Sequence, residues 1–215
     1  FFADAPFATG IAPAGMTYGD INSDTQNDLV VTSSDGRNDF RYLFRTEADT
    51  FETPLTYAVA ADYAAGDNPV AIALADLNGD DLADVITANA DTNDIDVFMN
   101  GGDGVLLAPT SYSSGTSPSG IAAGDITGDG LIDVVVTNAG ASTISLLTNF
   151  DGSSLNPATS LAVGPGPSSV AISDLDVDGN LDLVVTNGGS NDVSILMGIG
   201  GGLFDAPTSI TVGAN

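Results

Sequence analysis

The sequence contains no histidine, cysteine, lysine or tryptophan among its 215 residues. Without histidine and cysteine, the chain has no Ser-His-Asp triad, no Cys-His pair, no zinc site and no haem or iron–sulfur ligation. Its only basic residues are three arginines, too few to neutralise nucleic-acid phosphates. No apolar run approaches the ~20 residues of a membrane-spanning helix. We therefore expect neither nucleic-acid binding nor membrane insertion.

Acidic residues dominate the charge. The chain has 29 acids against 3 bases, a formal net charge of −26, and nearly all the acids are aspartate. High charge prevents folding only when hydrophobicity is low, and here 43% of the residues are hydrophobic. The chain therefore has enough apolar material for a core, and something must neutralise its concentrated negative charge.

The acids recur in a repeat. Four nine-residue segments carry aspartate at positions 1, 5 and 9, and their first aspartates lie 56, 49 and 49 residues apart. A proline precedes each segment by seven residues, and an apolar run follows it. The segments, numbered loops 1 to 4 along the chain, are Asp20–Asp28, Asp76–Asp84, Asp125–Asp133 and Asp174–Asp182.

Each repeat contains four short apolar runs rich in β-branched residues and bounded by Gly, Asn, Asp and Pro, a pattern typical of strands. No window shows a sustained period of 3.6 residues, so we expect no helix. Four-stranded units at a period of about 49 residues indicate propeller blades. We predict an all-β propeller, a single domain or part of one, with blades at about 11–59, 67–113, 116–163 and 165–212.

Residues 1–10 form a predicted surplus outer strand, because Phe2–Pro6 matches Phe204–Pro207 at the end of the last blade. Three explanations stay open. The chain is part of a longer ring of about seven blades, or the strand caps an edge of its own chain, or it pairs with another chain.

The aspartate loops predict calcium sites. Ca²⁺ takes six to eight oxygen ligands, and alternate residues of a tight loop turn their oxygens toward one centre. Positions 1, 3 and 5 offer side-chain oxygens, position 7 a backbone carbonyl, and position 9 closes the site. An EF-hand needs Glu at position 12, where this chain has Val31, Thr87, Val136 and Val185. Ordinary Asp and Asn turns are the alternative, but four copies with identical spacing argue against it.

We expect the four sites to differ. Loop 4 has four carboxylates and Gly179 at its turn, so it should bind calcium most tightly. Loop 3 has only Thr127 at position 3. Loop 1 has Thr25 where the turn glycine usually sits and should bind most weakly, and Asp81 at that place in loop 2 should face solvent.

The pattern D-x-[DN]-x-D-G-x-x-D-[LV]-V-V resembles the FG-GAP/VCBS repeats of integrin alpha-subunit propellers and of many bacterial secreted proteins. The Phe-Gly and Gly-Ala-Pro elements of the integrin version are missing, so the chain is more similar to the bacterial type. The resemblance implies up to four Ca²⁺ ions held at positions 1, 3, 5, 7 and 9. These positions are Asp20, Asn22, Asp24, Gln26, Asp28, Asp76, Asn78, Asp80, Leu82, Asp84, Asp125, Thr127, Asp129, Leu131, Asp133, Asp174, Asp176, Asp178, Asn180 and Asp182.

A functional site usually breaks repeat symmetry. The first repeat is seven residues longer than the others, and it holds Arg37, Arg41 and Arg45. These arginines form a candidate patch for an acidic sugar or a partner carboxylate, or else they simply offset nearby aspartates on a solvent-facing strand. Tyrosines such as Tyr112 are candidates for stacking on sugars or for interface packing.

Three hypotheses for function remain. The first is an extracellular, calcium-stabilised and non-catalytic binding or adhesion module for a glycan or a protein. The second is a structural subunit of a surface protein or fibre that contacts copies of itself. The third is an accessory region of a polysaccharide-degrading enzyme. The acidity suits a saline, calcium-rich bacterial or archaeal surface.

Overall fold

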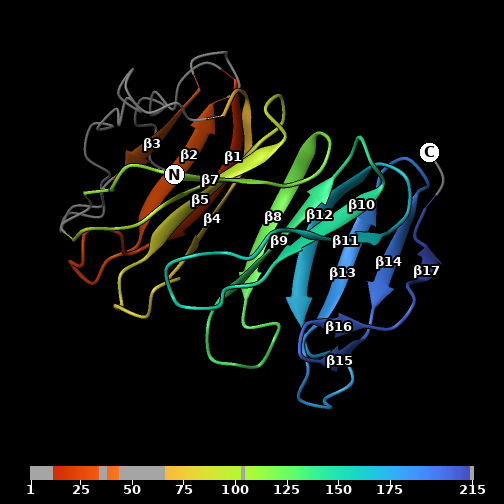
Figure 1. The fold of residues 1–215 in the computed structure, drawn as a ribbon. Coiled ribbons are helices and arrows are strands. Elements are labelled where there is room, and N and C mark those ends of the chain that lie inside the picture. Colours follow the sequence, from red (N-terminus) through yellow and green to blue (C-terminus); the bar gives the residue numbers. More distant parts are fainter. Residues whose placement is uncertain (1–11, 34–37, 44–65, 103–104, 214–215) are drawn as a thin grey trace, which may run out of the picture.

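The structure is a computed structural model, and it describes residues 12–33, 38–43, 66–102 and 105–213 (Figure 1). Every regular element in these ranges is a β-strand. The described residues accordingly include no helix long and apolar enough to cross a bilayer. The prediction of an all-β chain is confirmed.

The strands form four main antiparallel sheets, the blades, numbered 1 to 4 along the chain. Within a blade, each strand pairs with the next in sequence except at the end of blade 4, where β17 pairs with β14. Blade 1 comprises β1 (Pro13–Gly19), β2 (Asp28–Ser33) and β3 (Asp39–Leu43). Blade 2 comprises β4 (Pro69–Ala75), β5 (Asp84–Asn89), β6 (Asp94–Phe98) and β7 (Thr110–Ser113). Blade 3 comprises β8 (Pro118–Gly124), β9 (Asp133–Asn138), β10 (Thr143–Leu147) and β11 (Thr159–Ala162). Blade 4 comprises β12 (Pro167–Ser173), β13 (Asp182–Asn187), β14 (Asp192–Leu196) and β17 (Thr208–Thr211).

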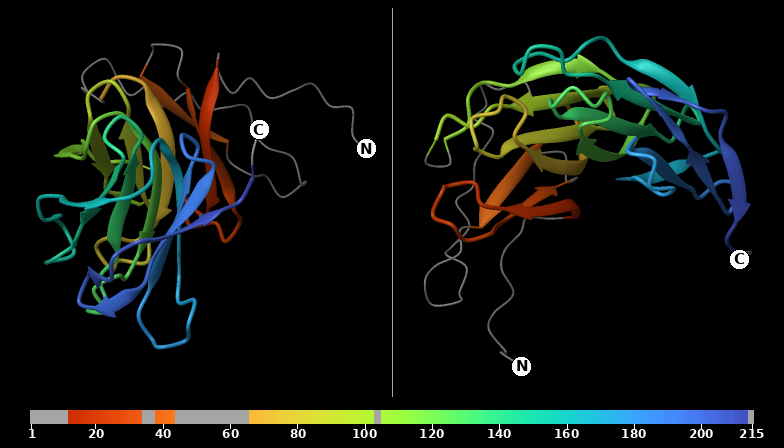
Figure 2. Two further views of the ribbon diagram at one scale, coloured as in Figure 1. Left: turned by 90° about the vertical axis from the view of Figure 1, so that its right-hand side faces the viewer. Right: turned by 90° about the horizontal axis from the view of Figure 1, so that it is seen from below.

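The blades follow one another along an arc. The first strands of the blades, β1, β4, β8 and β12, contact one another in that order and are the inner strands. Figure 2 shows the arc from below, open between β1 at one end and β17 at the other. The described residues thus form four consecutive propeller blades without closing a ring.

Small residues let the inner strands approach closely. A side chain at Gly15 of β1 would meet the Cα of Ala71 at 2.9 Å, and one at Gly120 of β8 would meet the carbonyl oxygen of Ser168 at 2.9 Å. Between blades 3 and 4 the Ser119 hydroxyl donates to the Pro167 carbonyl at 2.7 Å. Glycine at these two positions is therefore required by backbone contact between neighbouring blades.

The hydrophobic core lies between blades rather than within them. Three buried clusters join blade 1 to 2, blade 2 to 3 and blade 3 to 4. At the first junction the rings of Phe40 and Phe98 meet edge to face, with centroids 5.1 Å apart and planes at 72°. A blade therefore depends on its neighbour for burial, as in other repeat proteins.

Blade 4 differs from its neighbours. The segment after β14 forms a small two-stranded sheet from β15 (Gly198–Gly200) and β16 (Leu203–Phe204). In the described residues of blades 2 and 3, the isolated bridges Asn100–Leu106 and Asn149–Leu155 occupy this place. The surplus strand at residues 1–10 lies outside the described residues, so that hypothesis and the exact blade limits stay predictions.

Candidate metal centre

The four aspartate loops connect the inner strand of each blade to its second strand. They leave the same edge of the blades, at the lower side of Figure 1. Position 1 and positions 3 to 8 of each loop are exposed or half-buried, whereas position 2 is buried in loops 1 to 3. Position 9 begins the buried second strand. The repeat therefore places four chemically similar loops along one edge of the arc.

The carboxylate at position 1 organises each loop. In loop 4, Asp174 accepts the backbone N–H of Asp178 at 3.2 Å and of Gly179 at 3.0 Å. In loop 3, Asp125 accepts the N–H groups of Gly128, Asp129 and Gly130 at 2.8–3.0 Å. The loop backbone thus wraps around one carboxylate, which holds its oxygens on the inner side of the turn.

Positions 3 and 5 fold the same way. The Asp80 carboxylate accepts the N–H of Leu82 at 2.9 Å, while its own N–H donates to Asn78 at 3.0 Å. The corresponding contacts in loop 4 are Asn180 to Asp178 at 2.8 Å and Asp178 to Asp176 at 3.2 Å. Side-chain oxygens from positions 1, 3 and 5 consequently turn into the loop, as the spacing predicts.

The aspartate at position 9 is buried in every loop. In loop 4, Asp182 accepts the N–H of Leu175 with one oxygen and the N–H of Gly198 with the other, both at 2.7 Å. Each oxygen keeps one lone pair outside these two backbone bonds, so it can still face a cation. Position 9 is therefore a structural anchor as well as a potential ligand.

Burial affects the acidity of this position. It raises the pKa of the Asp84 carboxyl, although hydrogen bonds from the backbone of Asn100 and Leu77 oppose the shift. It also raises the pKa of Asp133 against the backbone hydrogen bonds that Asn149, Thr127 and Ile126 donate. A buried carboxylate near other carboxylates is costly without a counter-charge, and a divalent cation supplies one.

Loop 4 brings most of its acids together. Oxygens of Asp174, Asp176 and Asp182 all lie within 4.8 Å of one another, close enough to bind one cation. In loop 3 the buried hydroxyl oxygen of Thr127 lies near Asp133, where it slightly opposes the rise that burial causes in the pKa of that carboxyl, but it makes no hydrogen bond of normal geometry. A hard cation would satisfy both groups, so the residues present fit calcium.

Positions 4 and 6 of every loop adopt a left-handed backbone. Glycine occupies both positions in loop 3, where φ is +76° at Gly128 and +90° at Gly130. In loop 1, Thr25 has φ +70°, and in loop 4 Val177 has φ +63°. Both residues are β-branched and strained in this conformation. The predicted preference for glycine at position 6 is therefore physical, and position 4 shares it.

Two asparagines that the motif does not include complete the loops. The backbone N–H of Asn100 donates to Asp84 at 2.7 Å, and its side chain donates to the carbonyl of Ile21 in loop 1 at 2.9 Å. Asn149 makes the equivalent bonds to Asp133 at 2.8 Å and to Leu77 in loop 2 at 2.7 Å. Both lie 16 residues after position 9, a repeated spacing that the sequence analysis missed.

The predicted arginine patch is only partly described. Arg41 lies half-buried on β3, paired in register with Val31 of β2. Arg37 and Arg45 lie outside the described residues. The patch therefore stays a prediction.

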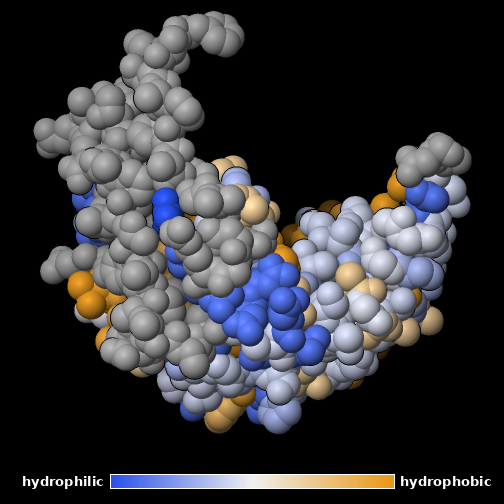
Figure 3. All heavy atoms as spheres, turned by 90° about the horizontal axis from the view of Figure 1, so that it is seen from above, coloured by the Kyte–Doolittle hydropathy of each residue, from blue (hydrophilic) through white to orange (hydrophobic). Residues whose placement is uncertain are grey.

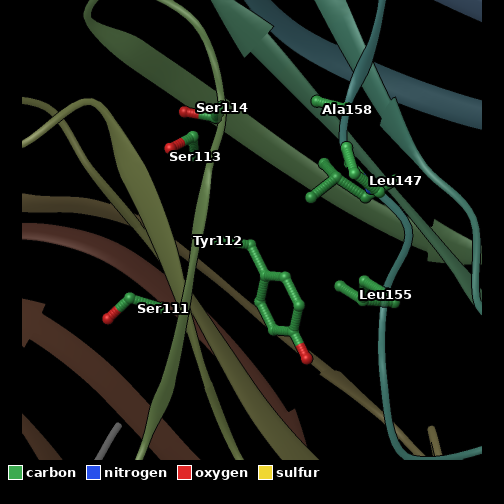
Figure 4. Close-up of a pocket in the computed structure, with 8 residues that line it drawn as sticks. Ser111, Tyr112, Ser113, Ser114, Leu147, Leu155 and Ala158 are labelled. Atoms are coloured by element: carbon green, nitrogen blue, oxygen red, sulfur yellow. The ribbon is translucent and has the colours of Figure 1, made fainter.

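A groove of about 460 Å³ lies between residues of blade 2 and residues of blade 3. Figure 4 shows the Tyr112 ring extending from β7 toward Leu155 of blade 3. Tyr112 takes the place that Leu161 and Ile210 have in blades 3 and 4. The groove is lined by Ser111, Tyr112, Ser113, Ser114, Leu147, Leu155, Pro157 and Ala158.

A buried acid lies behind this groove. Asp96 accepts hydrogen bonds from the Ser111 hydroxyl and from the backbone N–H of Gly66. The equivalent residues of blades 3 and 4 are Ser145 and Ser194. Figure 4 shows the Ser111 hydroxyl and the Tyr112 ring on opposite sides of β7, so the ring faces the groove and the hydroxyl does not. The aromatic ring lies at a place where the described repeats differ from one another.

Comparison with protein families supports the repeat assignment. Residues 20–87, 76–136 and 125–185 each match the family model of the FG-GAP-like repeat. Every match starts at position 1 of one loop and ends in the strand after the next loop. A comparison with curated proteins found no match.

Several solved structures are similar in fold. A functionally unknown protein from Desulfotomaculum acetoxidans aligns with a TM-score of 0.63 and 20% identity, over 92% of this chain and 55% of that one. A putative 6-phosphogluconolactonase from Bacteroides uniformis gives 0.66 and 16%, over 93% and 57%. An Agrocybe aegerita lectin that recognises non-reducing terminal N-acetylglucosamine gives 0.58 and 18%, over 90% and 51%. The chain thus spans about half the length of the structures it matches.

Proposed function

The chain belongs to the FG-GAP-like repeat family, and from this premise we propose that it is an extracellular, calcium-stabilised binding module without catalytic activity. Its ligand is a glycan or a protein surface. The observation that carries the calcium part is the convergence of Asp174, Asp176 and Asp182 in loop 4. The sequences of the other loops repeat the aspartates at positions 1, 5 and 9.

Calcium would be held by the side chains at positions 1, 3, 5 and 9 and the carbonyl at position 7. When bound, it supplies positive charge that cancels repulsion between the loop carboxylates. Position 9 connects each site to the fold, because the same carboxylate accepts backbone N–H groups from two different segments. Filling the loops therefore stabilises the blades.

The binding role rests on the groove between blades 2 and 3. Its volume of about 460 Å³ suits a small ligand or one residue of a larger one. The Tyr112 ring offers a face for a sugar or an apolar side chain. With a net charge of −26, the chain favours a neutral or basic ligand.

The non-catalytic role rests on the side chains available. The sequence has no histidine, cysteine or lysine. Most acids in the described blades belong to the repeated loops, where backbone N–H groups already occupy their oxygens. An active site would need an acid or base outside such contacts. Turnover of an acidic polysaccharide by the purified chain would contradict this part of the proposal.

Thermal unfolding tests the calcium role. We expect the melting temperature to rise with free calcium from a chelated sample to about 1–10 mM, with several kcal/mol of stabilisation if four sites fill. Magnesium at equal concentration is the control, and it should have a smaller effect because it dehydrates reluctantly. Equal melting with calcium and with chelator would refute a calcium-stabilised fold.

A glycan array in millimolar calcium tests the binding role. The variant Tyr112→Leu restores the residue type of blade 3 and should keep the fold while removing the aromatic face. Tyr18→Leu, on the exposed inner strand of blade 1, is the matched control. Loss of glycan signal in the first variant alone supports the groove. Equal signals in both variants would place the binding site elsewhere.

A further inference from the structure

The last blade of the arc leaves an apolar face uncovered. In blade 3, Val135 and Ile144 point toward blade 4 and are fully buried. The equivalent residues of blade 4, Val184 and Val193, are half-exposed, and Ile210 is 51% exposed. We call this surface the trailing face of blade 4. Among the described residues no sheet covers it, and Figure 3 shows hydrophobic residues at this tip of the crescent.

No sheet in the described part of the chain covers the opposite face of the first blade. Met16 and Tyr18 on β1 are 68% and 72% exposed. The residues equivalent to Met16 are Ile72 in blade 2 and Val170 in blade 4, and both are buried against the preceding blade. We call the surface of Met16, Tyr18 and the half-exposed Leu29 the leading face of blade 1.

These two faces are complementary by the construction of the repeat. At each internal junction a trailing face packs on the leading face of the next blade, and together they form a buried cluster. In the junction between blades 3 and 4, Val135 and Ile144 pack with Leu183 and Val185 in this manner. The chain therefore presents one unpaired trailing face and one unpaired leading face, at opposite ends of its described arc.

We infer that two copies of this chain dock head to tail, with the trailing face of blade 4 in one copy on the leading face of blade 1 in the other. Such a contact joins two different surfaces, so it forms a ring if its rotation closes. Two copies bring eight blades, which is within the range of four to eight found in propellers. The second copy thus continues an interface that the chain already forms three times internally.

Charge sets the conditions for this docking. Each copy carries a net charge of −26, which opposes association. Four bound Ca²⁺ ions would add eight positive charges and leave −18. Added salt screens the remainder over about 8 Å at 0.15 M. The docking is independent of any ligand in the groove between blades 2 and 3, so failure of one proposal leaves the other intact.

Multi-angle light scattering behind size exclusion tests this inference on the full 215-residue chain in calcium and about 0.15–0.5 M salt. One copy has a mass of 21.5 kDa. We expect a concentration-dependent shift to twice that mass. A chain that stays at the mass of one copy up to about 0.1 mM overturns the inference and assigns these faces to additional blades of a longer protein.

Two single variants test which surfaces meet. Met16→Asp disables the leading face, and Ile210→Asp disables the trailing face. Each alone should be monomeric, because every head-to-tail junction then contains one charged face. Their mixture keeps one intact junction, formed by the Ile210 side chain of the first variant and the Met16 side chain of the second. We therefore expect mixing to restore a complex of two copies.

Phe150→Asp is the matched control, since Phe150 is 56% exposed in a turn of blade 3 away from both faces. It should associate like the unmodified chain. Calcium-dependent melting verifies that each variant folds. Association that survives both single variants, or that the control also abolishes, contradicts docking through these faces.

Discussion

The side-chain amide of Asn149 in blade 3 donates a hydrogen bond to the backbone carbonyl of Leu77 in blade 2, 2.7 Å away and 72 residues earlier in the chain. Leu77 is position 2 of loop 2, and its own N–H donates to Asp84 at position 9. Asn149 in turn donates its backbone N–H to Asp133, position 9 of loop 3. One asparagine therefore links two consecutive candidate calcium loops through buried hydrogen bonds.

Replacing this asparagine should weaken the junction between blades 2 and 3. Asn149→Ala leaves the buried Leu77 carbonyl without its amide donor, which costs about 1–3 kcal/mol. We expect that loss in urea unfolding at saturating calcium. Asn156→Ala is the control, because the Asn156 side chain donates to the nearby Thr148 hydroxyl at the surface, and its loss should change stability little. Equal losses in both variants would show that the bond between blades contributes nothing.

The strained valine of loop 4 gives a second prediction. Val177 has φ +63° and a side chain that is 87% exposed, so glycine relieves strain and removes almost no packing. Val177→Gly should stabilise the chain by about 1 kcal/mol and tighten calcium binding at loop 4. Val105→Gly is the control at an exposed valine outside the left-handed residues, and it should destabilise. Destabilisation by both would refute strain at Val177.

Much of this fold follows from the sequence. The 1-5-9 aspartates and the prolines before them repeat with a fixed spacing, and the strands begin where that spacing places them, at Pro69, Asp84, Pro118 and Asp133. Local chemistry explains this success. Hydrogen bonds within nine residues shape each loop, and the β-branched run that follows each loop predicts a strand.

The remaining features depend on contacts between blades. The role of Asn149 cannot be predicted from its neighbours, because its partner Leu77 lies in another blade. The left-handed requirement at position 4 is hidden in the sequence by Ser23 and Val177, which occupy it without glycine. The groove beside Tyr112 likewise exists only once two blades are in contact.

Two aspartates of one motif should behave differently in the absence of calcium. Asp182 is buried and accepts two backbone N–H groups, so Asp182→Asn places an amide donor against them and costs about 1–3 kcal/mol even without calcium. Asp178 is exposed, so Asp178→Asn should change the stability of the calcium-free chain little. In calcium, both variants should lose the stabilisation that loop 4 contributes. Similar effects of both variants in chelator would contradict the anchoring role of position 9.

Lowering the pH should change the stability of the calcium-free chain and of the calcium-loaded chain in opposite directions. Burial raises the folded-state pKa of Asp84 and Asp133 above the ordinary aspartate value of 3.8. Above the raised pKa, keeping these buried groups charged costs the folded state free energy. This cost disappears as the pH falls from neutral toward 3.8, so the calcium-free chain should become more stable over that range.

The exposed acids do not reverse this sign within the same range. The Asn180 backbone N–H lowers the pKa of Asp178, and the Asn187 side chain lowers that of Asp192. Their stabilisation is present above 3.8 and is lost only as the pH falls through their lower folded-state values. In saturating calcium, protons compete with the ion for the same carboxylates, so the melting temperature should fall with pH. Melting curves from about pH 7 to 4 in calcium-free and calcium-loaded buffer measure both pH dependences. The same dependence in both buffers would contradict a role for the buried aspartates in calcium binding.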